Sequence, residues 1–238
     1  MTKPLEGQLA LVTGASRGIG AATAEALAKA GAHVIITART TEALEAVEDR
    51  IHRSGGNATI APLDLCDADS IAKLAQAIGG RWDKLDILVL NAAMLGTLGP
   101  VQHINAKEFA QIFTLNVSAQ QALIAAFDPL LRQSEAARVI GVTSSVGRAP
   151  RAYWGAYGGS KAAFETLLDA YADENRAANR IHVAIVDPGA TRTEMRAKAY
   201  PGEDPNSIKD PATVAEQITA LAVNGFTTGH RERVNHSV

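Results

Sequence analysis

The amino-acid sequence predicts an α/β fold, in which a doubly wound parallel sheet carries helices on both faces. Short runs rich in Val, Ile and Leu alternate with helical stretches along the chain. These runs are continuously apolar, which is typical of parallel strands that are covered on both faces. A glycine-rich turn joins the first run to the first helical stretch. We expect about seven strands in a single domain that covers residues 1–238.

The elements follow one another in a regular order. Strands are expected at residues 8–13, 33–37, 58–63, 86–90, 138–143 and 181–186. Helices are expected at residues 21–30, 41–53, 70–78, 106–132, 157–179 and 213–223, with the long fourth helix broken near Pro129. Residues 196–210 form a loose stretch, and a short polar tail follows the last helix. Because crossovers between parallel strands are right-handed, this order builds a doubly wound sheet.

Composition argues against several classes of function. The formal net charge of −2 offers no basic surface for nucleic acid or for an acidic membrane. The six histidines show no metal-ligand spacing, so no metal is expected. Cys66 is the single cysteine, so no internal disulfide can form, and we expect it to pack as a small apolar residue. The chain shows no signal peptide and no apolar run near 20 residues, and we expect a cytoplasmic protein.

The glycine-rich turn predicts a site for a dinucleotide. Residues 13–20 read TGASRGIG, with a strand before them and a helix after them. Gly14 permits a tight turn, Gly18 lets the backbone approach a pyrophosphate, and Gly20 lets the helix pack closely on the strand. The start of the helix then faces the phosphates with free N–H groups. Three glycines are a weak signal alone, but their place in an α/β pattern favours a dinucleotide.

The end of the second strand predicts which dinucleotide binds. Enzymes that use NAD usually place an acidic residue there for the ribose hydroxyls, whereas this chain has Arg39 and no acid in residues 37–40. Arg17 lies in the glycine turn, and two guanidinium groups suit a 2′-phosphate. We therefore predict NADP(H) in preference to NAD(H). The alternative is that both arginines are ordinary surface residues.

Tyr157 and Lys161 form a candidate acid–base pair. They are four residues apart near the start of a helix, so they share one face. A lysine charge about 4 Å away contributes about 4 kcal/mol at an effective dielectric of about 20. That charge lowers the tyrosine pKa by up to about three units, into the range of a useful acid or base. The pair alone is a weak signal because YxxxK occurs often by chance.

Seven segments together resemble the classical short-chain dehydrogenase/reductase family over nearly the whole chain. They are TGASRGIG (13–20), DL (64–65), LNAA (90–93), Asn116, TSSVG (143–147), YGGSK (157–161) and DPGATRTEM (187–195). The stretch 191–205 is similar to YciK-like bacterial members. The resemblance implies a Rossmann-type fold and an NAD(P)-dependent oxidoreductase that acts on CH–OH and C=O groups.

The resemblance also implies roles for single residues. Tyr157 would protonate the carbonyl oxygen, Lys161 would lower the tyrosine pKa and bind the nicotinamide ribose, and Ser144 would hold the substrate oxygen. Asn116 would hold a water that links Lys161 to solvent. The implied catalytic set is Asn116, Ser144, Tyr157 and Lys161. The cofactor set is Gly14, Ser16, Arg17, Gly18, Ile19, Gly20, Arg39, Asp64, Leu65, Asn91, Tyr157, Lys161, Pro188, Gly189, Thr191 and Thr193. Ser145 remains an alternative to Ser144 by residue type.

Three departures from the family pattern affect these expectations. The usual NNAG reads LNAA here, and a polar ending around Arg233 replaces a glycine-rich C-terminus, which puts tetramer contacts in doubt. Only 17 residues separate Thr193 from Pro211, so the substrate lid is short. Met94, Leu95, Tyr153, Trp154 and Met195 are expected at the pocket mouth, where they would suit an apolar or aromatic carbonyl compound.

We therefore expect an NADP(H)-dependent oxidoreductase that reduces a small carbonyl substrate or oxidises the corresponding alcohol. The alternative is a catalytically weak NADP(H)-binding sensor or scaffold. The helices around Asn116 and after Tyr157 are rich in alanine, and in the resembled family these helices form a dimer interface. We expect a homodimer, with a homotetramer possible.

Overall fold

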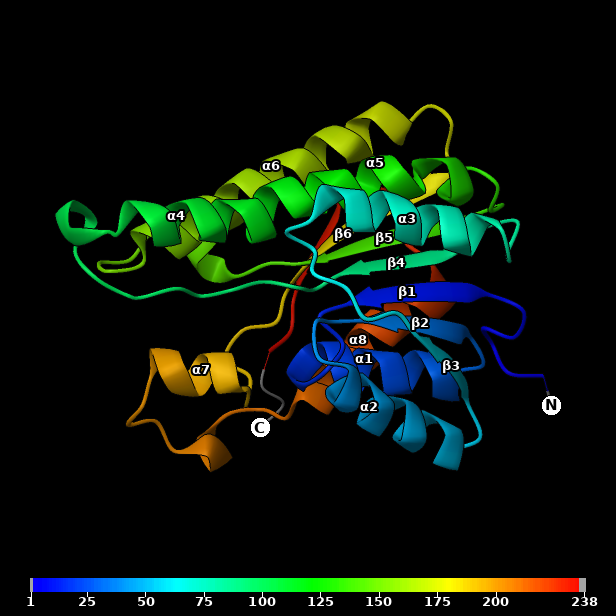
Figure 1. The fold of residues 1–238 in the computed structure, drawn as a ribbon, viewed down its shortest axis with the longest axis horizontal. Helices are drawn as coiled ribbons and strands as arrows, with labels where there is room; N and C mark the ends of the chain where they lie inside the picture. Colours follow the sequence, from blue (N-terminus) through cyan, green and yellow to red (C-terminus); the bar gives the residue numbers. More distant parts are fainter. Residues whose placement is uncertain (1, 236–238) are drawn as a thin grey trace.

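A computed structural model describes residues 2–235, and a seven-stranded parallel sheet forms its centre (Figure 1). The remaining residues of the expected domain, 1 and 236–238, lie outside the described residues. The strands are β1 (Leu9–Thr13), β2 (His33–Thr37), β3 (Asn57–Ile60), β4 (Ile87–Leu90), β5 (Ala137–Val142), β6 (Ile181–Asp187) and β7 (His230–Arg233). Their order is β3-β2-β1-β4-β5-β6-β7. The first three strands follow one another outward from β1 on one side, and β4 lies on the other side of β1, so the strand order changes direction there. This change confirms the predicted doubly wound fold class.

Helices cover both faces of the sheet. The principal helices are α1 (Gly18–Lys29), α2 (Thr41–Arg53), α3 (Ala68–Gly79), α4 (Ala106–Phe113), α5 (Ala119–Leu131), α6 (Gly155–Asn175), α7 (Glu194–Ala199) and α8 (Pro211–Asn224). Figure 1 shows α1, α2 and α8 on one face and α3, α4, α5 and α6 on the other. Two apolar cores lie between these layers and the sheet. Within residues 2–235, no helix combines the length and apolar character needed to cross a bilayer.

Side-chain caps explain where several helices begin. Asp67, Asn105, Thr193 and Asp210 each accept a hydrogen bond from a backbone N–H in the first turn of the helix that follows. Such acceptors satisfy N–H groups that have no partner within the helix. Residues 196–199 of α7 lie inside the stretch 196–210, which the sequence predicts to be without regular structure.

The expected break of the 106–132 helix near Pro129 is wrong. Pro129 lies within α5, two residues before its end, and the helix continues through it. The interruption is instead a π-helical segment, η2 (Thr114–Ser118), between α4 and α5. The side chain of Gln120 donates a 2.9 Å hydrogen bond to the carbonyl of Leu115 in this segment. The π-helical segment contains Asn116, one of the residues singled out from the sequence.

The expected polar tail is also wrong, because residues 230–233 form the edge strand β7 beside β6. Gly229 turns the chain with a φ of +84°, and its N–H donates a 2.8 Å hydrogen bond to the carbonyl of Val183. Polar side chains are common on edge strands, where they oppose pairing with other chains. Cys66 likewise departs from expectation, because it is exposed in the turn after β3 rather than packed as an apolar residue.

Candidate active site

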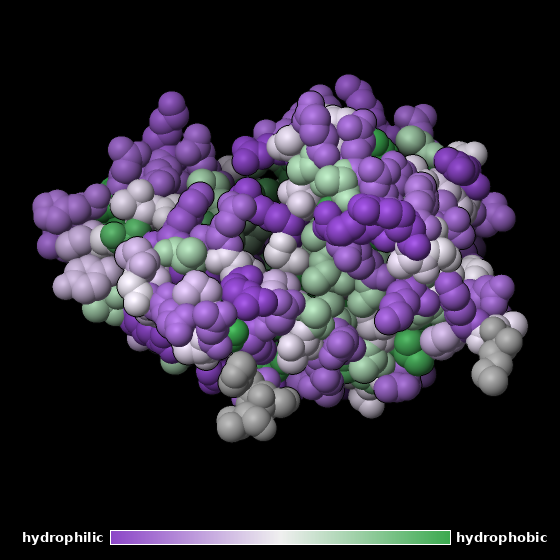
Figure 2. Space-filling model, turned by 90° about the horizontal axis from the view of Figure 1, so that it is seen from below, coloured by the Kyte–Doolittle hydropathy of each residue, from purple (hydrophilic) through white to green (hydrophobic). Residues whose placement is uncertain are grey.

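One large cleft lies at the carboxyl ends of the strands, where ligands of doubly wound sheets bind. Its volume is about 900 Å³. Figure 2 shows a hollow in the surface with apolar residues in its depth. The predicted site residues that line the cleft are Gly14, Ser16, Arg17, Gly18, Ile19, Arg39, Asp64, Leu65, Asn91, Ser144, Tyr157, Lys161, Pro188, Gly189, Thr191 and Thr193. Gly20 and Asn116 lie behind this lining.

The glycine turn has the backbone geometry that a bound pyrophosphate needs. Gly14 and Gly18 have φ angles of +65° and +56°, a region that favours glycine. A Cβ on Gly20 would lie 2.3 Å from the carbonyl oxygen of Gly14, so only glycine lets α1 start this close to β1. Arg17, which precedes α1, makes no side-chain cap, so the first N–H groups of α1 have no side-chain acceptor from that residue. These residues fit the phosphates of a dinucleotide.

The cleft is lined by both arginines that the sequence predicts as partners of a 2′-phosphate, Arg17 and Arg39. Arg17 forms a 2.9 Å ion pair with Glu194 of α7, and these two side chains are 66% and 61% exposed. Arg39 forms no ion pair with any residue that the structure describes. The partner of Arg17 was not foreseen, because nothing in the sequence brings residues 17 and 194 together.

Asn91 has a structural role beside the glycine turn. Its Nδ2 donates to the carbonyls of Thr13 and Gly14, at 2.9 and 3.2 Å. The hydroxyl of Thr13 accepts from the N–H groups of Asn91 and Ala92, at 3.0 and 3.1 Å. These bonds tie the end of β4 to the end of β1. Thr13, which is fully buried, was not singled out from the sequence as a site residue.

Asn116 lies behind the cleft wall and not in the cleft. Its Nδ2 donates to the carbonyl of Met94 at 2.9 Å and to the hydroxyl of Ser160 at 3.0 Å. Its Oδ1 accepts from the N–H of Met94 at 2.9 Å. The side chain therefore holds a cleft-lining segment against the helix that carries Tyr157.

Tyr157, Lys161 and Ser144 all line the cleft. Tyr157 and Lys161 come from the start of α6 and are 6% and 3% exposed. Ser144 follows the end of β5 in extended conformation, and it lines the cleft, whereas Ser145 begins the short helix η3 (Ser145–Gly147). Lys161 Nζ donates a 2.9 Å hydrogen bond to the carbonyl of Val142, and it lies 5.8 Å from the centre of the Tyr157 ring.

The electrostatics of this pair differ from the sequence-based expectation. Burial raises the pKa of Tyr157 well above its usual value, and the nearby carboxylate of Asp187 raises it further. Burial lowers the pKa of Lys161 to about 8, while the charge of Glu165 acts in the opposite direction. The expected lowering of the Tyr157 pKa is therefore wrong for this structure. Burial is the largest cause of both pKa shifts, because desolvation disfavours each charged form.

Apolar and polar side chains both line the cleft, the polar ones including Thr97, Glu108 and Gln111. The lining also includes the apolar residues expected at its mouth, Met94, Leu95, Trp154 and Met195. The expected position of Tyr153 is wrong, because this residue is 59% exposed and does not line the cleft. Its φ of +73° turns the chain so that the next residue, Trp154, faces inward. The ring centroid of Trp154 lies 6.0 Å from that of Tyr157, in an edge-on arrangement.

The short segment between Thr193 and Pro211 carries Arg196, whose charge is paired with that of Glu203. Arg196 lines the cleft, and both its Nε and its Nη2 are hydrogen-bonded to Glu203, at 2.6 and 2.5 Å. Its guanidinium also stacks on the ring of Tyr200 at 3.7 Å. The cleft therefore does not offer this arginine as a free partner for a substrate carboxylate.

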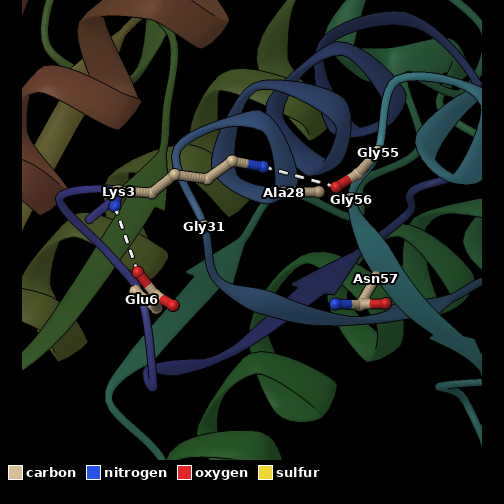
Figure 3. Close-up of a pocket in the computed structure, with 7 residues that line it drawn as sticks. All are labelled: Lys3, Glu6, Ala28, Gly31, Gly55, Gly56 and Asn57. Carbon is tan, nitrogen blue, oxygen red and sulfur yellow. Dashed lines mark hydrogen bonds between the residues drawn. The ribbon is translucent and has the colours of Figure 1, made fainter. Parts of the chain in front are cut away.

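A second, smaller pocket of about 280 Å³ lies away from the predicted site residues (Figure 3). Its lining residues come from the N-terminal segment and from the turns after α1 and α2. Lys3 Nζ donates to the carbonyl of Gly55 at 3.3 Å across it. A Cβ on Gly31 would lie 2.6 Å from the Cβ of Lys3, so this region is a close packing site for the N-terminal segment. Among residues 2–235, no group of three His, Cys, Asp or Glu side chains could hold a metal ion.

Comparison with known proteins gives matches over most of the chain. The family model for short chain dehydrogenases matches residues 8–204. An uncharacterized oxidoreductase from Escherichia coli K12, YciK, is 39% identical over 213 residues, which are 88% of this chain and 84% of that protein. The similarity to YciK confirms the YciK-like resemblance of the sequence.

Two solved structures bear on the cofactor. A short chain dehydrogenase from Shigella flexneri 2a, complexed with NADP, matches with a TM-score of 0.93 and 36% identity, over 98% of this chain and 99% of that one. A short chain dehydrogenase from Escherichia coli CFT073, complexed with NADPH, matches with a TM-score of 0.93 and 35% identity, over 99% of this chain and 100% of that one.

Proposed function

Because the chain belongs to the short-chain dehydrogenase family, we propose that it is an NADP(H)-dependent oxidoreductase that reduces a small apolar or aromatic carbonyl compound or oxidises the corresponding alcohol. One observation carries this proposal. A single cleft joins the glycine turn, which suits a dinucleotide, to Ser144, Tyr157 and Lys161, which suit proton transfer to a carbonyl oxygen. The glycine turn and Lys161 would hold NADP(H), whose nicotinamide would supply or accept the hydride.

The side chains in the cleft have distinct roles in this proposal. The hydroxyl of Ser144 holds the carbonyl oxygen of the substrate. Tyr157 donates its phenolic proton to that oxygen, and burial favours the protonated form that this step requires. Lys161 binds the nicotinamide ribose and places a positive charge near the developing oxyanion. Asn116 acts from behind the wall by fixing the Met94 segment and Ser160.

The apolar wall supports the proposed class of substrate. Met94, Leu95, Trp154 and Met195 surround the space in front of Tyr157. Methionine and tryptophan side chains bind apolar and aromatic groups well and exclude water. The pairing of Arg196 with Glu203 weakens the case for an acidic substrate.

Turnover with a panel of ketones and quinones tests the chemistry. We expect the wild type to oxidise NADPH, and we expect Tyr157→Phe to lose about 100-fold or more of that activity while it still binds NADPH. Substantial turnover by Tyr157→Phe would refute the role of Tyr157. A wild type that binds NADPH but turns over no member of the panel would favour a sensor or scaffold.

Cofactor preference is tested separately. Arg39→Asp should reverse the ratio of kcat/KM for NADPH over NADH, since it removes a 2′-phosphate partner and adds an acid for the ribose hydroxyls. Arg53→Asp makes the same change of charge at the end of α2 and should keep the wild-type preference. An Arg39→Asp protein that still prefers NADPH would contradict the assignment.

We also propose that the chain forms a homodimer, or a homotetramer built from such dimers. The alanine-rich helices α5 and α6 lie side by side on one face of the sheet (Figure 1). Small side chains allow a second pair of helices to approach closely. Light scattering at micromolar concentration should give at least twice the monomer mass, and a monomer at this concentration would refute the proposal.

A further inference from the structure

Glu165 is a buried carboxylate beside the proposed reacting groups. It lies four residues after Lys161 on α6, and 4% of its surface is exposed. Residues four apart on a helix share one face, with Cβ atoms about 6 Å apart. A buried carboxylate without partners is strongly unfavourable, so its surroundings must stabilise the charge.

The carboxylate of Glu165 accepts hydrogen bonds from both ends of the turn that carries Ser144. Thr143 Oγ1 donates a 2.6 Å hydrogen bond to Glu165 Oε1, and Arg148 Nε donates a 2.9 Å bond to Oε2. Thr143 directly precedes Ser144, and Arg148 directly follows η3, so both ends of the turn are bonded to one carboxylate. A Cβ on Gly147 would lie 3.2 Å from Glu165 Oε1. The turn therefore packs directly on Glu165.

The edge strand β7 supplies a second cation. Arg231 Nη1 donates a 2.6 Å hydrogen bond to Glu165 Oε2, and its Nη2 is bonded to Asp169 one turn further along α6. The side chain of Glu165 is 6% exposed, that of Arg231 25% and that of Asp169 49%. The C-terminal part of the described chain is therefore tied to the same helix as Lys161.

These partners keep Glu165 ionised. Burial alone would raise the pKa of its carboxyl group, but the hydrogen bonds from Thr143, Arg231 and Arg148 and the charge of Arg231 hold it below its usual range. A carboxylate that is ion-paired with Arg148 and Arg231 thus lies inside the protein, one helical turn from Lys161.

Few other groups near Lys161 could stabilise its positive charge. Tyr157 and Glu165 face it from its own helix, and the carbonyl of Val142 accepts its hydrogen bond from β5. Asp187, at the end of β6, raises the pKa of Tyr157. Burial lowers the pKa of Lys161 to about 8, and Glu165 limits that fall.

We propose that Glu165 is a positioning residue with two effects: it anchors the turn that carries Ser144, and its negative charge keeps Lys161 protonated in the cleft. The proposal rests on the function proposed above, in which Ser144 and Lys161 act on substrate and cofactor. It gives β7 a part in the site, because Arg231 completes the set of donors around Glu165.

Titration of Lys161 in Glu165→Gln tests the effect of the charge. The side-chain NMR signal of Lys161, assigned by its loss in Lys161→Met, is followed against pH in the wild type and in the variant. We expect the variant to titrate about one pH unit lower or more. An unchanged titration would overturn the proposal. This measurement needs no substrate, so it stands even if the panel of carbonyl compounds fails.

Two further variants separate the charge from the anchoring. Thr143→Val removes one anchor of the Ser144 turn but leaves Glu165 ionised, so kcat should fall while Lys161 titrates as in the wild type. Asp169→Asn removes a carboxylate that also binds Arg231 but is more exposed and one turn further from Lys161. The titration of Lys161 should stay within about 0.3 pH unit, because solvent screens this charge. A shift in Asp169→Asn as large as that in Glu165→Gln would assign the effect to net charge and overturn the proposal.

The proposal remains testable if Glu165→Gln does not fold, which thermal melting and NADPH binding would reveal. Glu165→Asp keeps the charge but is one methylene too short to reach both Thr143 and Arg148. We expect it to keep most of the Lys161 pKa and to lose kcat through the Ser144 turn. A Glu165→Asp protein with a strongly lowered Lys161 pKa or with wild-type kcat would contradict the proposal.

Discussion

Replacing Gly20 by alanine tests how closely α1 must approach β1 for the cofactor to bind. The added Cβ would lie 2.3 Å from the carbonyl oxygen of Gly14 and 2.5 Å from Asn91 Nδ2. Both distances are more than about 1 Å inside ordinary van der Waals contact. Neither atom can move freely. The Gly14 oxygen belongs to the backbone, and Asn91 Nδ2 is hydrogen-bonded to the carbonyls of Thr13 and Gly14.

The expected effect on stability follows from two opposing terms. Alanine favours a helix by up to about 1 kcal/mol over glycine. Overpacking of this kind costs about 1–3 kcal/mol. The steric term is larger here because the clash is with backbone, so we expect a net loss of about 1–2 kcal/mol in the free energy of unfolding. For a chain of this length that corresponds to a fall in Tm of roughly 2–8 °C.

The Kd for NADPH should be more sensitive than the free energy of unfolding to a displacement of the glycine turn. If the turn moves by about 1 Å, its N–H groups no longer meet the phosphates, and the Kd for NADPH should rise about tenfold or more, equivalent to about 1.4 kcal/mol. Thermal melting and a fluorescence titration with NADPH measure the two effects. Gly79→Ala, at the end of α3, is the control, because a Cβ there would meet only the two Cδ atoms of Leu130, at an ordinary 3.8 and 3.9 Å. Wild-type Tm and Kd in Gly20→Ala would refute the packing argument.

Three further predictions follow from burial and hydrogen bonding. Asn91→Ala removes two hydrogen bonds to buried backbone and should cost about 2–3 kcal/mol in unfolding free energy, measured by urea denaturation. Leu168→Ala, at a fully buried position, should cost about 2–5 kcal/mol, whereas Val101→Ala, at a position 71% exposed, should change stability by less than about 0.5 kcal/mol. Lys161→Met should melt at a higher temperature than the wild type at pH 7. Burial lowers the folded pKa of Lys161 from 10.5 to about 8, so the unfolded chain binds more protons between these values, and the wild type gains stability as the pH rises through them. The advantage of Lys161→Met should therefore shrink by pH 10, and an advantage that grows with pH would show the sign to be wrong.

Local patterns in the sequence were sufficient for the fold class and for much of the cleft. Continuous apolar runs identify buried parallel strands, and the glycine turn and the spacing of Tyr157 and Lys161 depend only on neighbouring residues. In a doubly wound sheet the loops after successive strands meet at one edge. Together with the family resemblance, this topology placed Gly14, Ser144 and Lys161 in one predicted site.

Contacts between distant segments account for the errors. The interruption of the 106–132 helix contains Asn116, whose side chain is hydrogen-bonded to Met94 in another loop. The strand β7 contains Arg231, whose charge is balanced by Glu165 and Asp169 on α6. Neither partner is near in sequence, so Pro129 and a polar tail were the natural but mistaken interpretations.

By itself, the sequence identified the candidate residues for the chemistry, because residue type and spacing are local properties. Only the tertiary structure decided the direction of their pKa shifts. At a spacing of four residues Lys161 was expected to lower the pKa of Tyr157, but burial raises that pKa and lowers that of Lys161. Burial and the carboxylate of Glu165 are both consequences of how α6 packs against β5, η3 and β7, and desolvation depends on the whole surroundings of a group rather than on its neighbours along the chain.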